Sequence, residues 1–251
     1  MQPRPFPPAL PHGELNEIFP DVYLVTGTIG LPRPMPVRFS RNMTVVREGK
    51  RVILINSVRL TDEGLKKLDK LGQVTDVIRL AGFHGSDDAF YKDRYGAKVW
   101  AIQGQRYTAG LDPRGKDVYF EADEQVTRNT QLPLENASLY VFGTKPPEAL
   151  LLLAREGGIL ITGDCLQNWG KADSYFSWAG SIMMKLMGFI KPHNVGPAWH
   201  KNTKPTAAEM RGILALEFEN VLPAHGAPVV GGAKAAFTPA IERAASTTFA
   251  K

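Results

Sequence analysis

Four side chains of the kinds that bind metal ions each follow closely on an apolar, strand-like segment: His84, Asp88, Asp164 and His225. Open α/β sheets carry their chemistry at the carboxyl ends of strands, so these four are candidates for one polar site. Two imidazoles and two carboxylates suit zinc, iron or manganese, and such a set supports metal-assisted hydrolysis. His84 and Asp88, which follow the same strand-like segment, are the catalytic candidates.

The segment around His84 also admits an interpretation without a metal. Ser86 is a good N-cap for a helix at 87–95, and Asp88 then lies in its first turn, where the helix dipole favours a carboxylate. Asp164 follows a glycine and is able to cap a loop. Both interpretations remain open at this stage.

The order of the apolar segments predicts the elements that position these residues. Strands are expected at 21–25, 43–47, 51–55, 76–80, 98–102, 138–142, 149–153, 158–162 and 221–222, and helices at 62–71, 87–95, 205–219 and 232–249, the last interrupted at or restarting from Pro239. Two hairpin-rich halves, each followed by helices, favour two packed sheets with helices outside. We expect an extended arm at 1–20 and a single domain at 21–251, with a long excursion at 166–204 and a loop at 27–40.

The composition is that of an ordinary globular protein, with 43% hydrophobic and 22% charged residues. The net charge of +5 is spread along the chain, and we expect no nucleic-acid partner. A single cysteine, Cys165, suits a reducing compartment. No signal peptide and no apolar run of the roughly 20 residues that a membrane span needs are visible. A cytoplasmic location is therefore the expectation.

Beyond these patterns, the chain resembles the metallo-β-lactamase superfamily. The resemblance rests on the order of elements, on Gly163-Asp164 after a buried strand and on Pro223-Ala224-His225-Gly226 near the C-terminus, and it covers roughly residues 15 to 235. It implies a four-layer αββα sandwich, of the α/β class, with one or two metal ions at the sheet edges.

Only part of the family's ligand set is present. The family signature is His-x-His-x-Asp-His, followed by a later His, a bridging Asp and a late His. By position, His84 matches the first His, Asp88 the signature Asp, Asp164 the bridging Asp and His225 the late His. Three other ligand positions hold residues of other types: Ser86, Ala89 and Thr144.

The resemblance therefore implies a hydrolase-like protein with a reduced, mononuclear site. One zinc, iron or manganese ion would be held by Asp88, Asp164 and His225, with His84 nearby as a fourth ligand or proton donor. The substrate would be a small molecule carrying an ester, thioester, amide or phosphodiester bond. The alternative is a non-catalytic member that has lost its metal and binds a small molecule or a protein partner.

Other residues of the chain offer fewer signs of a role in the site. His193, His200 and Cys165 are more typical of structural residues than of metal ligands. Three arginines of the early loop are candidates for contacting an anionic substrate: Arg33, Arg38 and Arg41. The apolar segment 176–190 suits packing in the core or a homodimer interface, and its single lysine argues against adsorption to a membrane.

Overall fold

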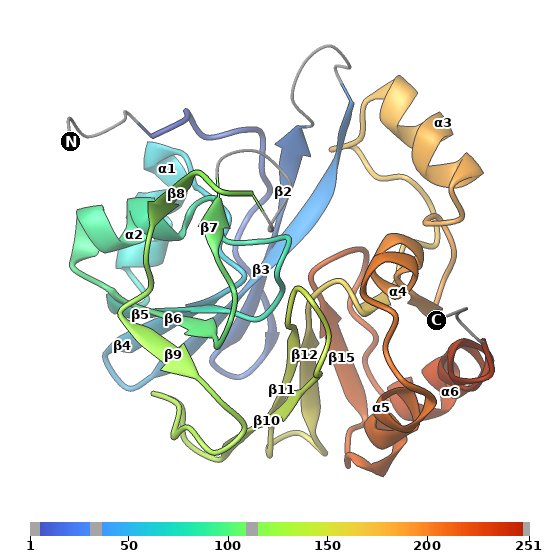
Figure 1. The fold of residues 1–251 in the computed structure, drawn as a ribbon. Coiled ribbons are helices and arrows are strands. Elements are labelled where there is room, and N and C mark those ends of the chain that lie inside the picture. Colours follow the sequence, from blue (N-terminus) through green and yellow to red (C-terminus); the bar gives the residue numbers. More distant parts are fainter. Residues whose placement is uncertain (1–5, 31–36, 109–114, 248–251) are drawn as a thin grey trace.

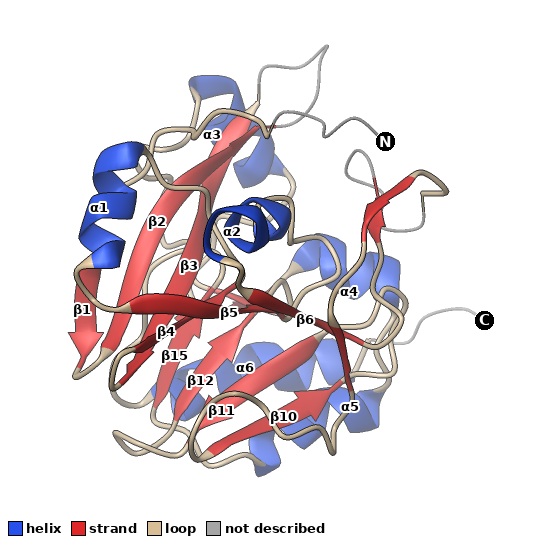
Figure 2. Ribbon diagram, turned by 90° about the vertical axis from the view of Figure 1, so that its left-hand side faces the viewer, coloured by secondary structure: helices blue, strands red, loops and turns tan. Residues whose placement is uncertain are grey.

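Two β-sheets face each other, and helices cover the outer face of each (Figures 1 and 2). The computed structural model describes residues 6–30, 37–108 and 115–247. The layers follow in the order helix, sheet, sheet, helix, which confirms the predicted αββα sandwich. Among the described residues, no helix is both long enough and apolar enough to cross a bilayer.

The larger sheet is mixed. In spatial order, its strands among the described residues are β1 (Asn16–Phe19), β2 (Val22–Gly30), β3 (Arg38–Glu48), β4 (Arg51–Ile55), β5 (Gln73–Arg79), β6 (Lys98–Ile102) and β9 (Glu124–Val126). The pairs from β1 to β4 are antiparallel, and those from β4 to β9 are parallel. The carboxyl ends of β4, β5 and β6 therefore meet at one edge.

The smaller sheet is built from the later part of the chain. Its strands are β10 (Ala137–Val141), β11 (Ala149–Leu153), β12 (Ile159–Thr162) and β15 (Asn220–Pro223). β12 and β15 are parallel, with Thr162 opposite Pro223. The residues that follow these two strands, Asp164 and His225, thus leave the sheet at the same edge.

Alternation along β11 shows how the sequence separates the layers. Leu151 and Leu153 lie in the buried cluster between the sheets, whereas Leu150 lies in the cluster under the helices. Side chains alternate between the two faces of a strand, so an all-apolar strand must be covered on both. The cluster under the helices is covered by α5 (Ala207–Gly212), by the 3₁₀ turn η1 (Ile213–Ala215) that follows it, and by α6 (Ala233–Ala245).

On the larger sheet, α1 (Asp62–Asp69) and α2 (Asp88–Tyr95) cover the outer face. Thr61 caps α1, since its side chain accepts a hydrogen bond from the N–H of Gly64. The helix predicted at 87–95 begins at Asp88, but Ser86 is not its cap. Asp87 holds that position without a side-chain cap bond, because its carboxylate faces Arg41.

Several predicted boundaries differ from the structure. β2 and β3 take in both ends of the predicted loop at 27–40, whose residues 31–36 lie outside the described part of the chain, and the segment 1–20 includes β1. The helix at 205–219 is shorter, and α6 continues through Pro239. The packing of Phe237 and Ile241 on the smaller sheet outweighs the one backbone hydrogen bond that a proline removes.

The excursion at 166–204 forms a separate layer beside the site. It contains a two-stranded ribbon of β13 (Leu166–Gln167) and β14 (Asn194–Val195), together with α3 (Trp178–Leu186) and α4 (Pro197–Thr203). A second short ribbon, β7 (Tyr107–Thr108) and β8 (Val118–Phe120), lies beyond β6.

Because the core lies between the two sheets, a cavity made there should lower the free energy of unfolding. Leu151→Ala should lower the free energy of unfolding by about 2–5 kcal/mol, because Leu151 is fully buried in the inter-sheet cluster. Urea unfolding followed by circular dichroism measures this. Val230→Ala, on an exposed side chain, should change stability by less than about 0.5 kcal/mol. Equal effects for the two variants would contradict the layer assignment.

Candidate metal centre

Three of the four candidate side chains converge. Within the described residues, His84, Asp164 and His225 form a group whose ligand atoms all lie within 4.8 Å of one another. His84 Nε2 lies 3.2 Å from His225 Nε2, and Asp164 Oδ1 lies 3.1 Å from His225 Nε2 and 3.6 Å from His84 Nε2. Residues up to 141 positions apart along the chain thus present three atoms to one point.

Two asparagines hold these strand ends together across the two sheets. The N–H of Leu80 donates to Asn56 Oδ1, and Asn56 Nδ2 donates to the carbonyl of Thr162, which joins the end of β5 to the end of β12. Asn42 Nδ2 of β3 donates to the carbonyls of Pro223 and Gly226, on either side of His225. Both asparagine side chains are buried. They fix the backbones from which the three ligand candidates project.

The hydrogen bond of His225 fixes its tautomer. His225 Nδ1 lies 3.1 Å from the carbonyl oxygen of Ser40, which only accepts, so Nδ1 carries the proton and donates it. Nε2 then presents a lone pair, as a metal-ligating histidine does when its other nitrogen donates to a carbonyl. Nε2 and Asp164 Oδ1 are therefore two acceptors 3.1 Å apart, an arrangement that needs a cation or a proton between them.

The spacing of the three atoms suits a tetrahedral ion. Ligand bonds of about 2.0–2.1 Å place neighbouring ligand atoms about 3.3 Å apart in a tetrahedron. The three separations here are 3.1, 3.2 and 3.6 Å. In addition, Asp164 Oδ2 is buried without a hydrogen-bond partner among the described residues. The donor set and its unsatisfied oxygen thus fit a divalent ion.

Electrostatics favour the ligating forms of His84 and Asp164. Burial lowers the pKa of His84, against the opposing effect of Asp164, so the imidazole stays neutral. Burial alone would raise the pKa of Asp164, but the two histidines hold that pKa below its usual value, so the carboxylate stays ionised. Neutral imidazole and ionised carboxylate are the forms that bind metal.

The structure does not bring Asp88 into this group. The hydroxyls of Ser57 and Tyr107 each donate to one of its carboxylate oxygens at 2.6 Å, and its side chain is fully buried. Burial is the chief cause that raises its pKa. Asp88 opens α2, so its side chain lies in the first helical turn, and both oxygens are already occupied. His84 therefore takes the place in the three-residue set that the sequence assigned to Asp88.

Two of the positions that depart from the family signature have local hydrogen-bond partners. Ser86 Oγ accepts a hydrogen bond from Arg41 at 3.1 Å, and Arg41 also pairs with the buried Asp87. Thr144 Oγ1 donates to the carbonyl of Pro146. Of the early-loop arginines, Arg41 is thus drawn into the site region, while Arg33 lies outside the described residues.

Among known proteins, this chain matches solved structures only. No protein-family model and no curated sequence matches the chain. Solved structures do match. VMB-1, crystallised at pH 5.5, has a TM-score of 0.59 at 16% identity, covering 93% of this chain and 98% of that one. The metallo-β-lactamase FIM-1 of Pseudomonas aeruginosa, in its mono-zinc form, has a TM-score of 0.58 at 12% identity, covering 97% and 100%.

A metallo-β-lactamase of Erythrobacter litoralis also matches, with a TM-score of 0.58 at 14% identity, covering 91% of this chain and 96% of that one. The chain has the metallo-β-lactamase fold. The resemblance carried by the sequence is therefore confirmed at the level of the fold, over almost the whole chain. The centre of His84, Asp164 and His225 lies at the strand ends of this fold, between its two sheets.

An aromatic wall closes one side of the centre. The ring of Trp169 lies 4.8 Å from that of His225, and Phe39 packs against both rings. Trp169 Nε1 donates to Ser40 Oγ, so the residue whose carbonyl orients His225 also fixes the wall. This wall was not predicted from the sequence, because Phe39 lies at the start of β3 and Trp169 follows β13, more than 120 residues later.

The remaining candidates lie outside the three-residue group. His193 packs against Phe237, and His200 faces the carbonyl of Ala244. Cys165 is fully buried in the cluster under the helices. None of these three belongs to the group of ligand candidates found among the described residues.

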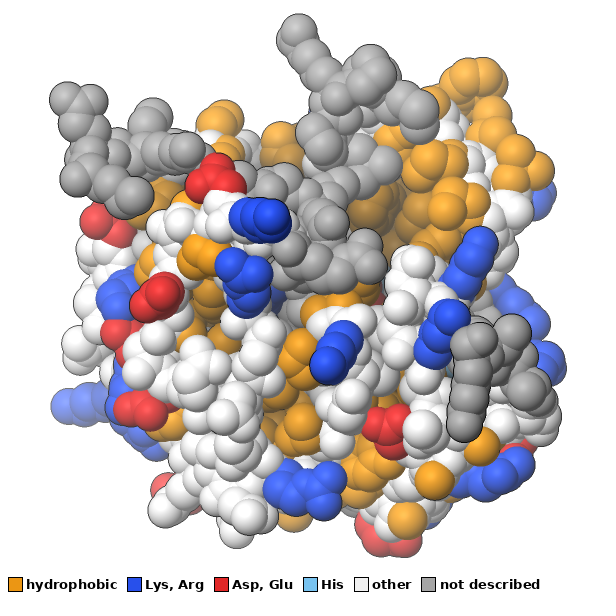
Figure 3. All heavy atoms as spheres, in the orientation of Figure 1, with side chains coloured by type: hydrophobic (Ala, Val, Ile, Leu, Met, Phe, Trp, Pro, Cys, Tyr) orange, Lys and Arg blue, Asp and Glu red, His pale blue; other side chains and the backbone are white. Residues whose placement is uncertain are grey.

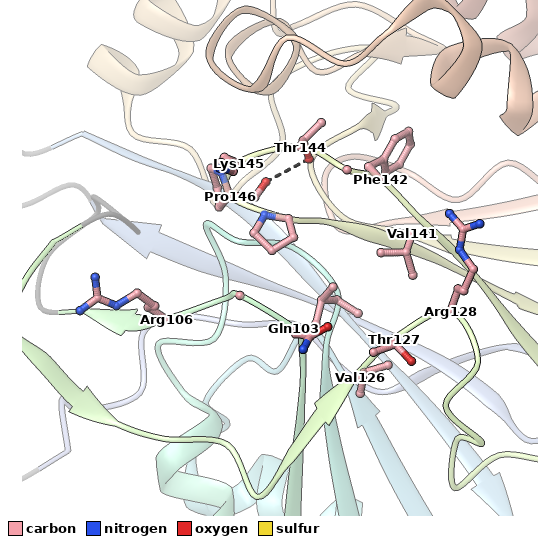
Figure 4. A pocket seen from close by; sticks show the side chains of 14 residues that line it. Gln103, Arg106, Val126, Thr127, Arg128, Val141, Phe142, Thr144, Lys145 and Pro146 are labelled. Atoms are coloured by element: carbon pink, nitrogen blue, oxygen red, sulfur yellow. Dashed lines mark hydrogen bonds between the residues drawn. The ribbon is translucent and has the colours of Figure 1, made fainter.

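An open pocket of about 620 Å³ lies near the centre, between the ends of β6 and β9 and the loop 143–147 (Figure 4). Its lining includes Arg106, Arg128 and Lys145 and, among the described residues, no acidic side chain. Arg106 and Arg128 stand on opposite sides of it in Figure 4. The three ligand candidates do not line the pocket. Pro146, which does line it, contacts Gly82, two residues before His84.

Glu148 is a buried carboxyl that the sequence analysis did not select. Its Oε1 accepts the N–H of Cys165 at 2.7 Å, and its Oε2 has no partner among the described residues. Burial and then the charge of Asp164 raise the pKa of Glu148 well above its usual value. The sequence does contain a signal for this burial. Glu148 directly precedes the apolar run of β11, and a strand of that composition is buried on both faces.

Glu148 generates a pH-dependent prediction. The folded state holds its proton more tightly than the unfolded chain, so its contribution to stability is full below the unfolded pKa of 4.5 and is lost as pH rises through the folded value. Glu148→Gln keeps the acceptor and carries no titrating proton. The variant should gain stability relative to the parent as pH rises above 4.5, by about 1–3 kcal/mol at mildly alkaline pH.

Urea unfolding across this pH range measures the difference. Glu217→Gln is the matched control, because the Glu217 carboxylate is exposed, and it should leave the pH profile of stability unchanged. Parallel pH profiles for Glu148→Gln and the parent protein would show that Glu148 does not titrate differently on folding.

Proposed function

We propose that this protein is a divergent member of the metallo-β-lactamase superfamily, a hydrolase-like protein with one divalent ion held by His84, Asp164 and His225. The observation that carries the proposal is the convergence of three ligand atoms within 4.8 Å, two of them acceptors that only a cation or proton reconciles. Two imidazole nitrogens and a carboxylate suit zinc, and also iron or manganese.

A divalent ion bound here would supply Lewis-acid activation of water and of the scissile bond. The chain's own residues do the rest. His225 is oriented by Ser40, and the Trp169 wall excludes water from that side of the ring. The Arg41 guanidinium lies against Ser86, the position where the family places its second histidine, and it is buried. In this proposal Arg41 is a positioning residue, which holds the turn after His84 through Ser86 and Asp87.

Asp88 is a positioning residue in this proposal rather than a ligand. Through Ser57 and Tyr107, it ties the start of α2 to the end of β4 and to the ribbon beyond β6. The turn that carries His84 is thereby held from its far side. The substrate class remains that of the sequence analysis, a small molecule with a hydrolysable ester, thioester, amide or phosphodiester bond, and the expected location remains the cytoplasm.

Metal analysis tests the proposal. Protein purified without a metal-affinity tag should carry about one equivalent of zinc, iron or manganese. Asp164→Ala and His225→Ala should each weaken metal binding at least about 100-fold, since even the loss of a residue that orients a ligand costs about 10–100-fold. Asp88→Asn should keep the metal, because its carboxylate lies outside the group. Elemental analysis and a competition titration with a chelator give both values.

Thermal unfolding of each variant serves as the control for folding. If folded parent protein takes up no divalent ion, the proposal is wrong. If Asp88→Asn loses the ion as completely as Asp164→Ala while staying folded, the assignment of the third ligand is wrong, and Asp88 returns as a ligand.

A second candidate function is favoured by the basic pocket beside the centre. Three basic side chains and apolar walls of Val126, Val141 and Phe142 suit a small amphipathic anion. In that case the protein is a non-catalytic member of the fold that binds such a molecule. It would then show no change in stability on addition of chelator, and Arg128→Gln would weaken ligand binding.

A further inference from the structure

Helix α3 presents a stripe of large apolar side chains to solvent. Trp178 is 81% exposed and Leu186 is 83% exposed, and Ile182 and Met187 are also exposed. Trp178, Ile182 and Leu186 are spaced by four residues, so they lie on one face of the helix. Figure 3 shows hydrophobic side chains gathered over α3, at the upper right of the molecule. The prediction that the segment 176–190 packs in the core is thus wrong for this face.

The opposite face of α3 is fixed to the body. Gly180 lies so close to β3 that a Cβ there would come within 2.2 Å of the Arg38 carbonyl oxygen. Met184 is buried in a cluster with Trp169 and Phe189. Ser177 caps the helix and accepts the N–H of Arg38. The helix therefore has a single rotational setting, in which the apolar stripe faces outward.

The exposure is concentrated at this helix. Seven large hydrophobic side chains are exposed among the described residues, and four of them belong to α3 or its C-cap. Scattered exposed apolar residues are ordinary on a protein surface, whereas a contiguous set marks an interaction surface. The stripe thus needs an occupant.

The charges around α3 indicate which occupant. Between residues 174 and 208 the sequence has four lysines, at 185, 191, 201 and 204, and no aspartate or glutamate. Basic side chains lie below α3 on the face shown in Figure 3. A two-fold dimer would place this surface against itself, so its lysines would meet like charges without a counter-charge. An anionic surface compensates them instead.

We propose that α3 docks on an anionic phospholipid surface, with Trp178, Ile182 and Leu186 at the level of the headgroups. A tryptophan and long aliphatic side chains on one face, bordered by lysines, are what interfacial helices use. Lysine stems also reach past apolar surface while their ammonium groups contact phosphates. The single lysine inside the segment argued against adsorption in the sequence, but the surrounding 35-residue stretch without an acid changes that balance. The proposal does not depend on the proposed function.

The site lies next to this surface. Met184 of α3 and Trp169 share one buried cluster, and Trp169 contacts the ring of His225. A lipid surface bound to α3 would therefore be separated from the candidate metal centre by α3 itself and by the ring of Trp169.

Co-sedimentation of the full chain with vesicles tests the proposal. The chain should bind vesicles of phosphatidylcholine mixed with phosphatidylglycerol and bind much less to phosphatidylcholine alone, and added salt should weaken the binding. Leu186→Glu should lower partitioning by about tenfold or more, because it removes an inserted leucine and adds a repelled charge. Val230→Glu, made at an exposed apolar residue away from α3, should bind as the parent does.

Tryptophan emission supplies an independent readout. Trp169 and Trp199 are buried and Trp100 is partly buried, so Trp178 should account for a blue shift on adding anionic vesicles. Trp178→Phe should bind but lose that shift. Absence of binding, or equal effects of Leu186→Glu and Val230→Glu, would overturn the proposal. So would a lipid-free dimer, seen by analytical ultracentrifugation, that Leu186→Glu dissociates, since the occupant would then be a second copy.

Discussion

The centre depends on two buried asparagines that join one sheet to the other. Ordinarily, the two layers of a sandwich meet only through apolar side chains, which are indifferent to small shifts along the strands. Asn56 and Asn42 instead make directional hydrogen bonds from the larger sheet to the backbone beside Asp164 and on both sides of His225. Leaving such buried amides unpaired costs free energy, so slippage of the sheets is opposed at this edge. These hydrogen bonds hold the two sheets in one relative position, which sets the spacing of the three candidate ligand atoms.

The sequence was enough to predict the layers and most of the strands, because the alternation and the all-apolar runs of β11 and β12 have one physical explanation. It also selected His84, Asp164 and His225 as candidates, because each closely follows a strand. That the three converge needed the structure, since His84 follows a strand of the larger sheet and the other two follow strands of the smaller one. Nor could the sequence place Asp88. Whether a carboxylate in a first helical turn faces the centre or turns to hydroxyls depends on Ser57 and Tyr107, which lie 31 and 19 residues away. The outward face of α3 was equally hidden, because apolar composition alone favours burial.

Charge is balanced differently here from what a two-ion site would require. Ser86 and Thr144 cannot replace imidazoles as ligands, and Ser86 is held by Arg41, whose own charge is paired with Asp87. Burial and the charge of Asp164 raise the pKa of Glu148 well above its usual value, which disfavours a second negative charge beside Asp164. Asp164 is the one carboxylate in the group of ligand candidates found among the described residues. The changes at the signature positions and the buried acid therefore belong to the same electrostatic arrangement.

Position 226 tolerates almost no residue other than glycine. Its φ is +92°, and a Cβ there would come within 2.1 Å of the Asn168 carbonyl carbon. The residue after the last candidate ligand is thus pressed against the start of the excursion, where Asn168 forms a bridge with it. Even alanine would have to move the excursion or His225. Homologues that keep this centre should therefore retain glycine at that position, while those that replace it should also have remodelled the excursion.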